Sequence, residues 1–248
     1  MSFLGFTQLT TAQINNPSVY SNNMSLGTLG ADRRGEIYAW TQAGASNLAI
    51  GKANIAPAKV SNDTNRSLAA VSNIAIGSTK FTVSAGGTVT ADQYAGGYLV
   101  VNDGTGKGQR FQIISNTPDY VSGSDTHAVD VLTHDANTVA LVVADTKVIL
   151  EANPNANVVV ATGDASTYFC VGVNETAVTA AYYFWAKVRG ITSVLSDGVV
   201  AKGTSAILSP SVAGALVTEG TSGVVKRVAY APEATVDAKY YPMFMDLL

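Results

Sequence analysis

Two histidines, His127 and His134, are the side chains best suited to general-base chemistry or to metal binding, and Asp130 lies between them. Imidazole and carboxylate groups together form a common donor set for transition metals. Side chains on a continuous strand alternate between its two faces, so residues seven positions apart point in opposite directions. A shared ion would require a turn between the histidines. The spacing therefore favours polar surface residues, and we predict no metal site.

A glycine-rich stretch, Asn102–Arg110, contains Lys107 and could form a phosphate-binding loop. A P-loop places Ser or Thr after its lysine and continues into a helix, whose amide groups face the phosphate. Here Gly108 follows Lys107, and Phe111–Ile114 has the pattern of a strand. The stretch is therefore interpreted as a hairpin between Tyr98–Val101 and Arg110–Ile114, without a bound cofactor.

Nucleophilic and acid–base catalysis have weak support in this sequence. The single cysteine, Cys170, lies in the apolar segment Tyr168–Val171, which favours a buried thiol over a reactive one. A Gly-x-Ser-x-Gly elbow is missing, and the carboxylates are scattered singly. We therefore predict no catalytic residue and no enzymatic activity.

An aromatic cluster, Tyr182–Trp185, could stack on sugars or bases together with Tyr38 and Trp40. Large flat side chains more often cover neighbouring strands in a β-sheet core or fill a subunit interface. We favour the core or interface interpretation, and a glycan-binding module remains the weaker alternative.

Composition limits the classes of partner. The chain has 248 residues, of which 13% are charged, and a formal net charge of −3. No global positive field is available to attract nucleic acid or an anionic membrane surface. The longest apolar run, residues 180–186, is far shorter than the roughly 20 residues of a membrane-spanning helix. The start of the chain lacks a basic, apolar signal-peptide pattern, so synthesis in the cytoplasm is expected.

The sequence predicts an all-β fold with three parts. Residues 1–34 lack clean periodicity and are expected to form an extended N-terminal arm, whose apolar side chains need a surface supplied elsewhere. Residues 35–165 alternate short β-branched segments with turns, which predicts a β domain with glycine-rich hairpins. Residues 166–248 predict a small C-terminal β-barrel, with a hairpin at Asp197–Gly198 and a docked strand at the chain end.

Four segments carry a resemblance to a known class of protein: Gly35–Trp40, Thr90–Tyr98, Asp103–Arg110 and Tyr182–Gly190. They resemble head decoration proteins of tailed bacteriophages, which are also called cement or capsid-stabilising proteins. The resemblance covers the chain from about residue 30. The spacing of the strand segments predicts two antiparallel sandwich or barrel modules after the arm. The resemblance implies a homotrimer that binds the major capsid protein on the exterior of the virion.

On this interpretation the protein stabilises the phage head by bridging neighbouring capsid subunits. A tail, neck or fibre component of the virion is the alternative with the same composition. Interface contacts are expected from aromatic and arginine side chains, which contribute strongly to binding. These candidate interface residues lie in and next to the arm: Phe3, Phe6, Tyr20, Arg33, Arg34, Tyr38 and Trp40.

Overall fold

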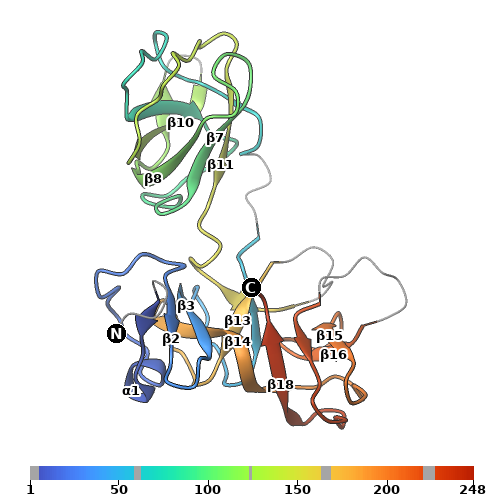
Figure 1. Cartoon of the computed structure of the whole chain (residues 1–248). Helices are drawn as coiled ribbons and strands as arrows, with labels where there is room; N and C mark the ends of the chain where they lie inside the picture. The colour runs from blue at the N-terminus through green and yellow to red at the C-terminus, as the bar shows by residue number, and fades with distance from the viewer. Residues whose placement is uncertain (1–5, 59–62, 123–124, 163–168, 220–226) are drawn as a thin grey trace. The chain divides into compact units, whose positions relative to one another are not determined.

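The computed structural model describes residues 6–58, 63–122, 125–162, 169–219 and 227–248 (Figure 1). It is nearly all β, with 42% of residues in strands and 2% in helices, which confirms the predicted class. No helix in these described ranges has the length and apolar character of a membrane span.

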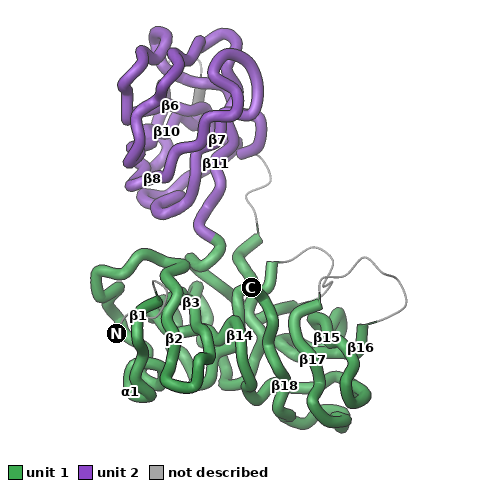
Figure 2. Tube along the Cα trace, in the orientation of Figure 1, with its two compact units in different colours: residues 1–58, 154–248 green, residues 59–153 purple. Residues whose placement is uncertain are grey.

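The chain folds as two compact units, and the first is assembled from both ends of the sequence (Figure 2). Unit 1 contains residues 1–58 and 154–248, and unit 2 contains residues 59–153. These boundaries differ from those predicted at residues 34 and 165. The difference arises because strands from the first 58 residues pair with strands from the last 95, so unit 2 is an insertion between them.

Unit 1 contains a sheet of eleven strands among the described residues. Its main path runs β1-β2-β3-β14-β18-β17-β15-β16, while β13 pairs with β14 and β4, and β4 also pairs with β12. The strands of this sheet are β1 (Thr7–Gln8), β2 (Leu29–Ala31), β3 (Ile37–Gln42), β4 (Ala53–Ile55), β12 (Val159–Val160), β13 (Cys170–Asn174), β14 (Tyr183–Leu195), β15 (Ser205–Leu208), β16 (Leu216–Thr218), β17 (Ala229–Tyr230) and β18 (Tyr240–Asp246). A separate C-terminal barrel over residues 166–248 is therefore not confirmed.

The N-terminal segment packs onto unit 1, so an arm that lacks burial of its own is not confirmed. A short helix, α1 (Thr11–Ile14), begins at Thr10, whose side chain and that of Gln13 form a capping box. Leu9 and Ile14 are only 2% and 6% exposed. They pack in one apolar cluster with Tyr38, Trp40 and Trp185. The sequence patterns missed this because isolated apolar side chains, including the partly buried Met24 and Leu26, and two very short strands make the contact instead of a periodic face.

Unit 2 contains a seven-stranded sheet among its described residues, in the order β5-β11-β7-β8-β10-β6 with β9 on β10. A bridge between Leu68 and Val83 brings the first and last strands of that path together, so the sheet curls around a core in which Phe81 and Phe111 stack. The strands are β5 (Arg66–Ser67), β6 (Lys80–Ser84), β7 (Tyr98–Asp103), β8 (Arg110–Asn116), β9 (Tyr120–Ser122), β10 (Asp125–Thr133) and β11 (Lys147–Glu151).

The sequence predicted two hairpins and a docked strand at the chain end. One hairpin and the docked strand are confirmed. The glycine-rich stretch is a hairpin, because β7 and β8 on either side of it pair antiparallel. The chain end is a docked strand, β18, which pairs with β14. The hairpin at Asp197–Gly198 is wrong: Gly198 makes a turn with φ +76°, but β14 ends at Leu195 and its partners are β3, β13 and β18.

Candidate functional site

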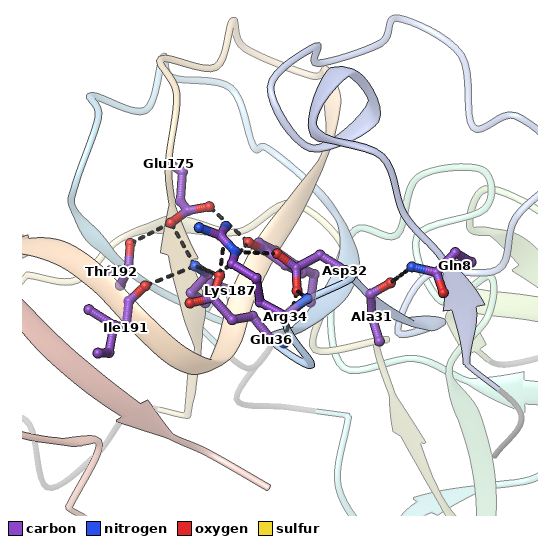
Figure 3. Close-up of polar contacts among 10 residues, drawn as sticks. Gln8, Ala31, Asp32, Arg34, Glu36, Glu175, Lys187, Ile191 and Thr192 are labelled. Atoms are coloured by element: carbon purple, nitrogen blue, oxygen red, sulfur yellow. Dashed lines mark hydrogen bonds and ion pairs between the residues drawn. The ribbon is translucent and has the colours of Figure 1, made fainter. Parts of the chain in front are cut away.

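A buried ammonium group lies at the centre of a cluster of charged side chains in unit 1. Lys187, on β14, has a side chain that is 1% exposed. Its Nζ lies 2.8 Å from Glu36 Oε2 and 2.8 Å from Glu175 Oε1, and it donates to the carbonyl oxygen of Ile191 at 2.9 Å (Figure 3). All three N–H groups of the ammonium therefore have an acceptor, as a buried charge requires.

Tyr38, on β3, holds the second oxygen of Glu175. Its hydroxyl donates to Glu175 Oε2 at 3.0 Å, and its ring centroid lies 5.0 Å from the Lys187 ammonium. Burial, and then the neighbouring Glu175 carboxylate, raise the pKa of Tyr38 far above its usual value. The phenol therefore stays protonated and acts as a hydrogen-bond donor rather than as a base.

Arg34 and Asp32 extend the cluster towards solvent. Arg34 Nε lies 2.9 Å from Asp32 Oδ2, and its Nη2 lies 3.0 Å from Glu36 Oε2. Burial acts to raise the pKa of Asp32, but hydrogen bonds from the Arg34 side chain and from the backbone N–H groups of Glu36 and Arg34 outweigh it and hold that pKa below its usual value. Two cations face three carboxylates in this cluster, which leaves one net negative charge.

One glycine, Gly190, and a register shift make room for these side chains. The pairing of β14 with β3 shifts register between Lys187 and Arg189. Gly190 has φ +114°, and a Cβ there would lie 2.8 Å from Glu36 Cγ. Only glycine fits this backbone conformation and this close approach. The bulge and the glycine together allow Glu36 to reach the ammonium group of Lys187.

A pocket of about 230 Å³ opens beside Glu175. Its lining combines one carboxylate, two aliphatic or aromatic surfaces and hydroxyl groups, contributed by Ile50, Gly51, Glu175, Thr192, Ser193 and Tyr240. Thr192 Oγ1 donates to Glu175 Oε1 at 3.0 Å, and Thr192 is 4% exposed. The pocket contains a hydrogen-bonding anion, but it presents neither a histidine nor a thiol.

The predicted interface residues separate into exposed and buried sets. Tyr20 is 73% exposed, and Arg33 is exposed; Arg34 is also exposed, although it is paired with Asp32 and Glu36. Phe6 is half-buried, and Phe3 lies outside the described residues.

Tyr38 and Trp40 belong to the interior of unit 1. They are 0% and 2% exposed, and Trp40 packs against Trp185 with ring centroids 5.0 Å apart. Trp185 is itself 3% exposed. These three aromatic side chains therefore lie in the core, as the core interpretation predicted. Because they are buried, a sugar cannot stack on them in this fold.

The remaining candidates from the sequence are the cysteine, the two histidines and the glycine-rich hairpin. Cys170 is buried, which raises the pKa of its thiol to about 12. His127 Nδ1 lies 2.8 Å from Asp119 Oδ2, whereas His134 is exposed. In the glycine-rich hairpin, Thr105 donates through its amide and its hydroxyl to Asp145. Within the described ranges, no three His, Cys, Asp or Glu side chains are grouped to hold a metal ion.

Sequence reasoning missed Lys187, Glu36 and Glu175. One signal was available: Lys187 interrupts an apolar run, Phe184–Val188, that a buried strand would otherwise explain. A charged residue in such a run requires a buried partner. The partners themselves are not recognisable locally, because Glu36 lies 151 positions away in the sequence.

Three comparisons bear on the identity of the chain. Searches against protein-family models, curated proteins and solved structures each found no match. The candidate site is therefore argued from its geometry alone.

Proposed function

We propose that the chain is a non-enzymatic structural protein of a tailed-phage virion. It binds the outer surface of the major capsid lattice as a homo-oligomer, with a trimer favoured, and stabilises the head by bridging neighbouring subunits. The resemblance of four sequence segments to decoration proteins supports this role. The all-β architecture is compatible with it, since paired strands make a stiff tie between subunits.

The observation that carries the proposal is an apolar outward face on β14 and β18. Ile191 lies directly opposite Phe244, and Leu195 lies opposite Tyr240. Ile191 is 52% exposed, Tyr240 48% and Phe244 37%. Pro242, between them, is also exposed. A contiguous row of large apolar side chains on one face of a sheet is typical of a protein–protein contact.

Burial of this face would give each copy a modest affinity. A fully buried Ile or Phe side chain contributes about 1.5–3 kcal/mol, and these side chains are already partly covered. On a lattice, neighbouring contacts are held at high effective concentration, so weak contacts add up to stable attachment. We therefore expect weak binding to an isolated capsid subunit and strong binding to an assembled head.

Location is tested by quantitative mass spectrometry of purified virions of the phage that encodes the chain. The proposal predicts a copy number comparable with that of the capsid subunits. A small ring-like copy number would instead support the alternative of a tail, neck or fibre component. Absence of the chain from the particles would refute a virion role.

Attachment is tested by adding back purified protein to heads that lack it. Ile191→Glu combined with Phe244→Glu should abolish attachment, because two charges would replace the centre of the apolar face. Val71→Glu, at a fully exposed position in unit 2, is the control and should attach normally. Unchanged attachment of the double variant, with the fold intact by tryptophan fluorescence, would contradict the role of this face.

A further inference from the structure

We propose that the pocket beside Glu175 binds the basic side chain of a partner polypeptide, a lysine or an arginine. The inference rests on the proposed function only in placing a polypeptide against the outward face of β14 and β18. The chemical class of the ligand is argued from the pocket itself.

The carboxylate of Glu175 retains capacity to accept a hydrogen bond. Its two oxygens offer about four acceptor positions. Oε1 accepts from Lys187 and Thr192, and Oε2 accepts from Tyr38. One position on Oε2 is therefore unused among the described contacts, while the side chain is 24% exposed. Glu175 lines the pocket, so a donor that enters it meets a carboxylate whose acceptor positions are not all used.

The walls suit a cation carried on an apolar stem. The ring of Tyr240 reaches across β14 to Gly51, since a Cβ at Gly51 would lie 2.7 Å from Tyr240 Cε1. Gly51 has φ +67°, which favours glycine, and the close contact with the Tyr240 ring leaves little room for a side chain. The Tyr240 ring offers a cation–π surface, and Ile50 offers an aliphatic one. Ser193 adds a hydroxyl with no side-chain hydrogen bond to the described residues.

Charge and size narrow the ligand further. The cluster behind the pocket carries one net negative charge, which favours a cation and disfavours an anion. A volume of about 230 Å³ lies below the roughly 300–1,000 Å³ of small-molecule sites and fits a single long side chain. One carboxylate is too few ligands for a metal ion, which takes about four or more donors.

The neighbouring apolar face indicates that the side chain comes from a polypeptide. Tyr240 belongs both to the pocket and to the row that contains Ile191 and Phe244. A partner backbone that covers this row would therefore present a Lys or Arg at the pocket. The apolar row would supply most of the affinity, and the pocket would select a partner with a basic residue at that position.

The pocket is tested on the isolated protein by NMR. Backbone-labelled protein is titrated with N-acetyl-arginine methylamide, with N-acetyl-lysine methylamide and with the neutral N-acetyl-glutamine methylamide. We expect saturable shifts of the Ile50, Gly51 and Ser193 amides with the two cationic compounds only. Tyr240→Ala should weaken binding roughly two- to fivefold, the range of an exposed cation–π contact. Tyr20→Ala, at another exposed tyrosine, should leave binding unchanged.

Equal shifts with the neutral compound, or full binding by Tyr240→Ala, would overturn the inference. Glu175→Gln should abolish the saturable amide shifts with the cationic compounds. This variant is a valid test only if its tryptophan fluorescence matches that of the native protein, which shows that it is folded. This readout is separate from head attachment. If the native protein does not bind the cationic compounds, the pocket inference fails and the attachment result is unaffected. If the Ile191→Glu/Phe244→Glu variant attaches normally, the role of the apolar face in the proposed function is contradicted, whereas cation binding measured on the isolated protein is unaffected.

Discussion

The two units differ in whether their lysine–carboxylate ion pairs are buried or exposed. In unit 1, the Lys187 ammonium is 1% exposed and lies between two carboxylates. In unit 2, the comparable pair joins Lys80, which is 63% exposed, to Asp130 at 2.8 Å. The interatomic distances are the same, so distance alone does not show which pair contributes more to stability. Burial does, because removing one partner from a desolvated pair leaves an uncompensated charge, whereas water replaces a partner at the surface.

Among the described side chains of unit 2, one carboxylate, that of Asp63, is buried, and its partners are neutral. Asp63 is 0% exposed, accepts from the amide of Gly86 at 2.7 Å and also accepts from the hydroxyl of Tyr94. Burial, and then that hydrogen bond to Asp63, raise the pKa of Tyr94. The comparison therefore has three levels: a buried ion pair, a buried carboxylate with neutral donors, and a surface ion pair.

The largest effect is expected for Lys187→Met. Removal of the ammonium leaves Glu36 and Glu175 close together and partly desolvated, which should lower the free energy of unfolding by about 3–5 kcal/mol. Both tryptophans of the chain, Trp40 and Trp185, lie in unit 1. Tryptophan fluorescence during urea unfolding therefore measures this unit separately.

Two companion variants sharpen this comparison. Lys80→Met, in unit 2, should change stability by less than about 1 kcal/mol, as expected for an exposed pair. Combining Lys187→Met with Glu36→Gln and Glu175→Gln should recover part of the loss, because no carboxylate is then left unpaired. An unchanged urea midpoint for Lys187→Met would contradict a stabilising role for the buried pair.

The next effect concerns the N-terminal segment. Leu9 is 2% exposed, and a Cβ at Gly30 would lie 2.7 Å from its side chain. Leu9→Ala should therefore destabilise unit 1 by about 2–5 kcal/mol, the range for a buried leucine. Tyr20→Ala, in the same segment but 73% exposed, should stay within about 0.5 kcal/mol. Equal urea midpoints for Leu9→Ala and native protein would contradict the packing of this segment and would support the extended N-terminal arm predicted from the sequence.

The sequence predicted the strands better than their assembly. Strands such as β7, β8 and β11 follow from short segments rich in β-branched residues and bounded by turn residues, which are local signals. Unit 1 depends instead on pairing between Trp40 and Trp185, on strands separated by a whole inserted unit. Nothing in either segment specifies a partner so distant, so the division at residue 58 could not be read from local patterns.

The candidate site illustrates the same limit. Lys187 was recognisable as a charge in an apolar strand, but Glu175 occupies a position that a solvated turn carboxylate would also occupy. Their proximity depends on how β13 pairs with β14, where Val173 lies opposite Lys187. The predicted hairpin at Asp197–Gly198 is wrong for a similar reason. Ser196 forms a bridge with Leu216, and the Asp197 amide donates to the Leu216 carbonyl oxygen, so the chain here pairs with a more distant residue instead of with those that directly follow Gly198.

An intermediate effect is expected for Tyr94→Phe in unit 2. The change removes the hydroxyl donor of the buried Asp63 and should cost about 1–3 kcal/mol, the penalty for an unsatisfied buried group. Hydrogen exchange of residues 80–116 should increase, while tryptophan fluorescence of unit 1 should not change. Tyr98→Phe is the matched control, because no hydrogen bond of its hydroxyl is present among the described residues. Equal exchange in the two variants would contradict the role of the Asp63 contact.

The smallest effect is the acid sensitivity of the surface pair. Burial acts to raise the pKa of Asp130, but hydrogen bonds from Lys80, Thr82 and Tyr120 outweigh it and hold that pKa below its usual value. The unfolded chain, with an ordinary pKa of about 3.9, then takes up a proton at higher pH than the folded chain does. The contribution of Asp130 is therefore present above about pH 4 and is lost as the pH falls through the lower, folded-state pKa.

Asp130→Asn removes this titration. Native unit 2 should lose up to about 1 kcal/mol more than the variant between neutral and acidic pH, after allowance for solvent screening of an exposed pair. Far-UV circular dichroism during urea unfolding measures the difference, and added salt should reduce it. Parallel pH profiles for the two proteins would mean that this exposed pair contributes nothing measurable to the stability of unit 2.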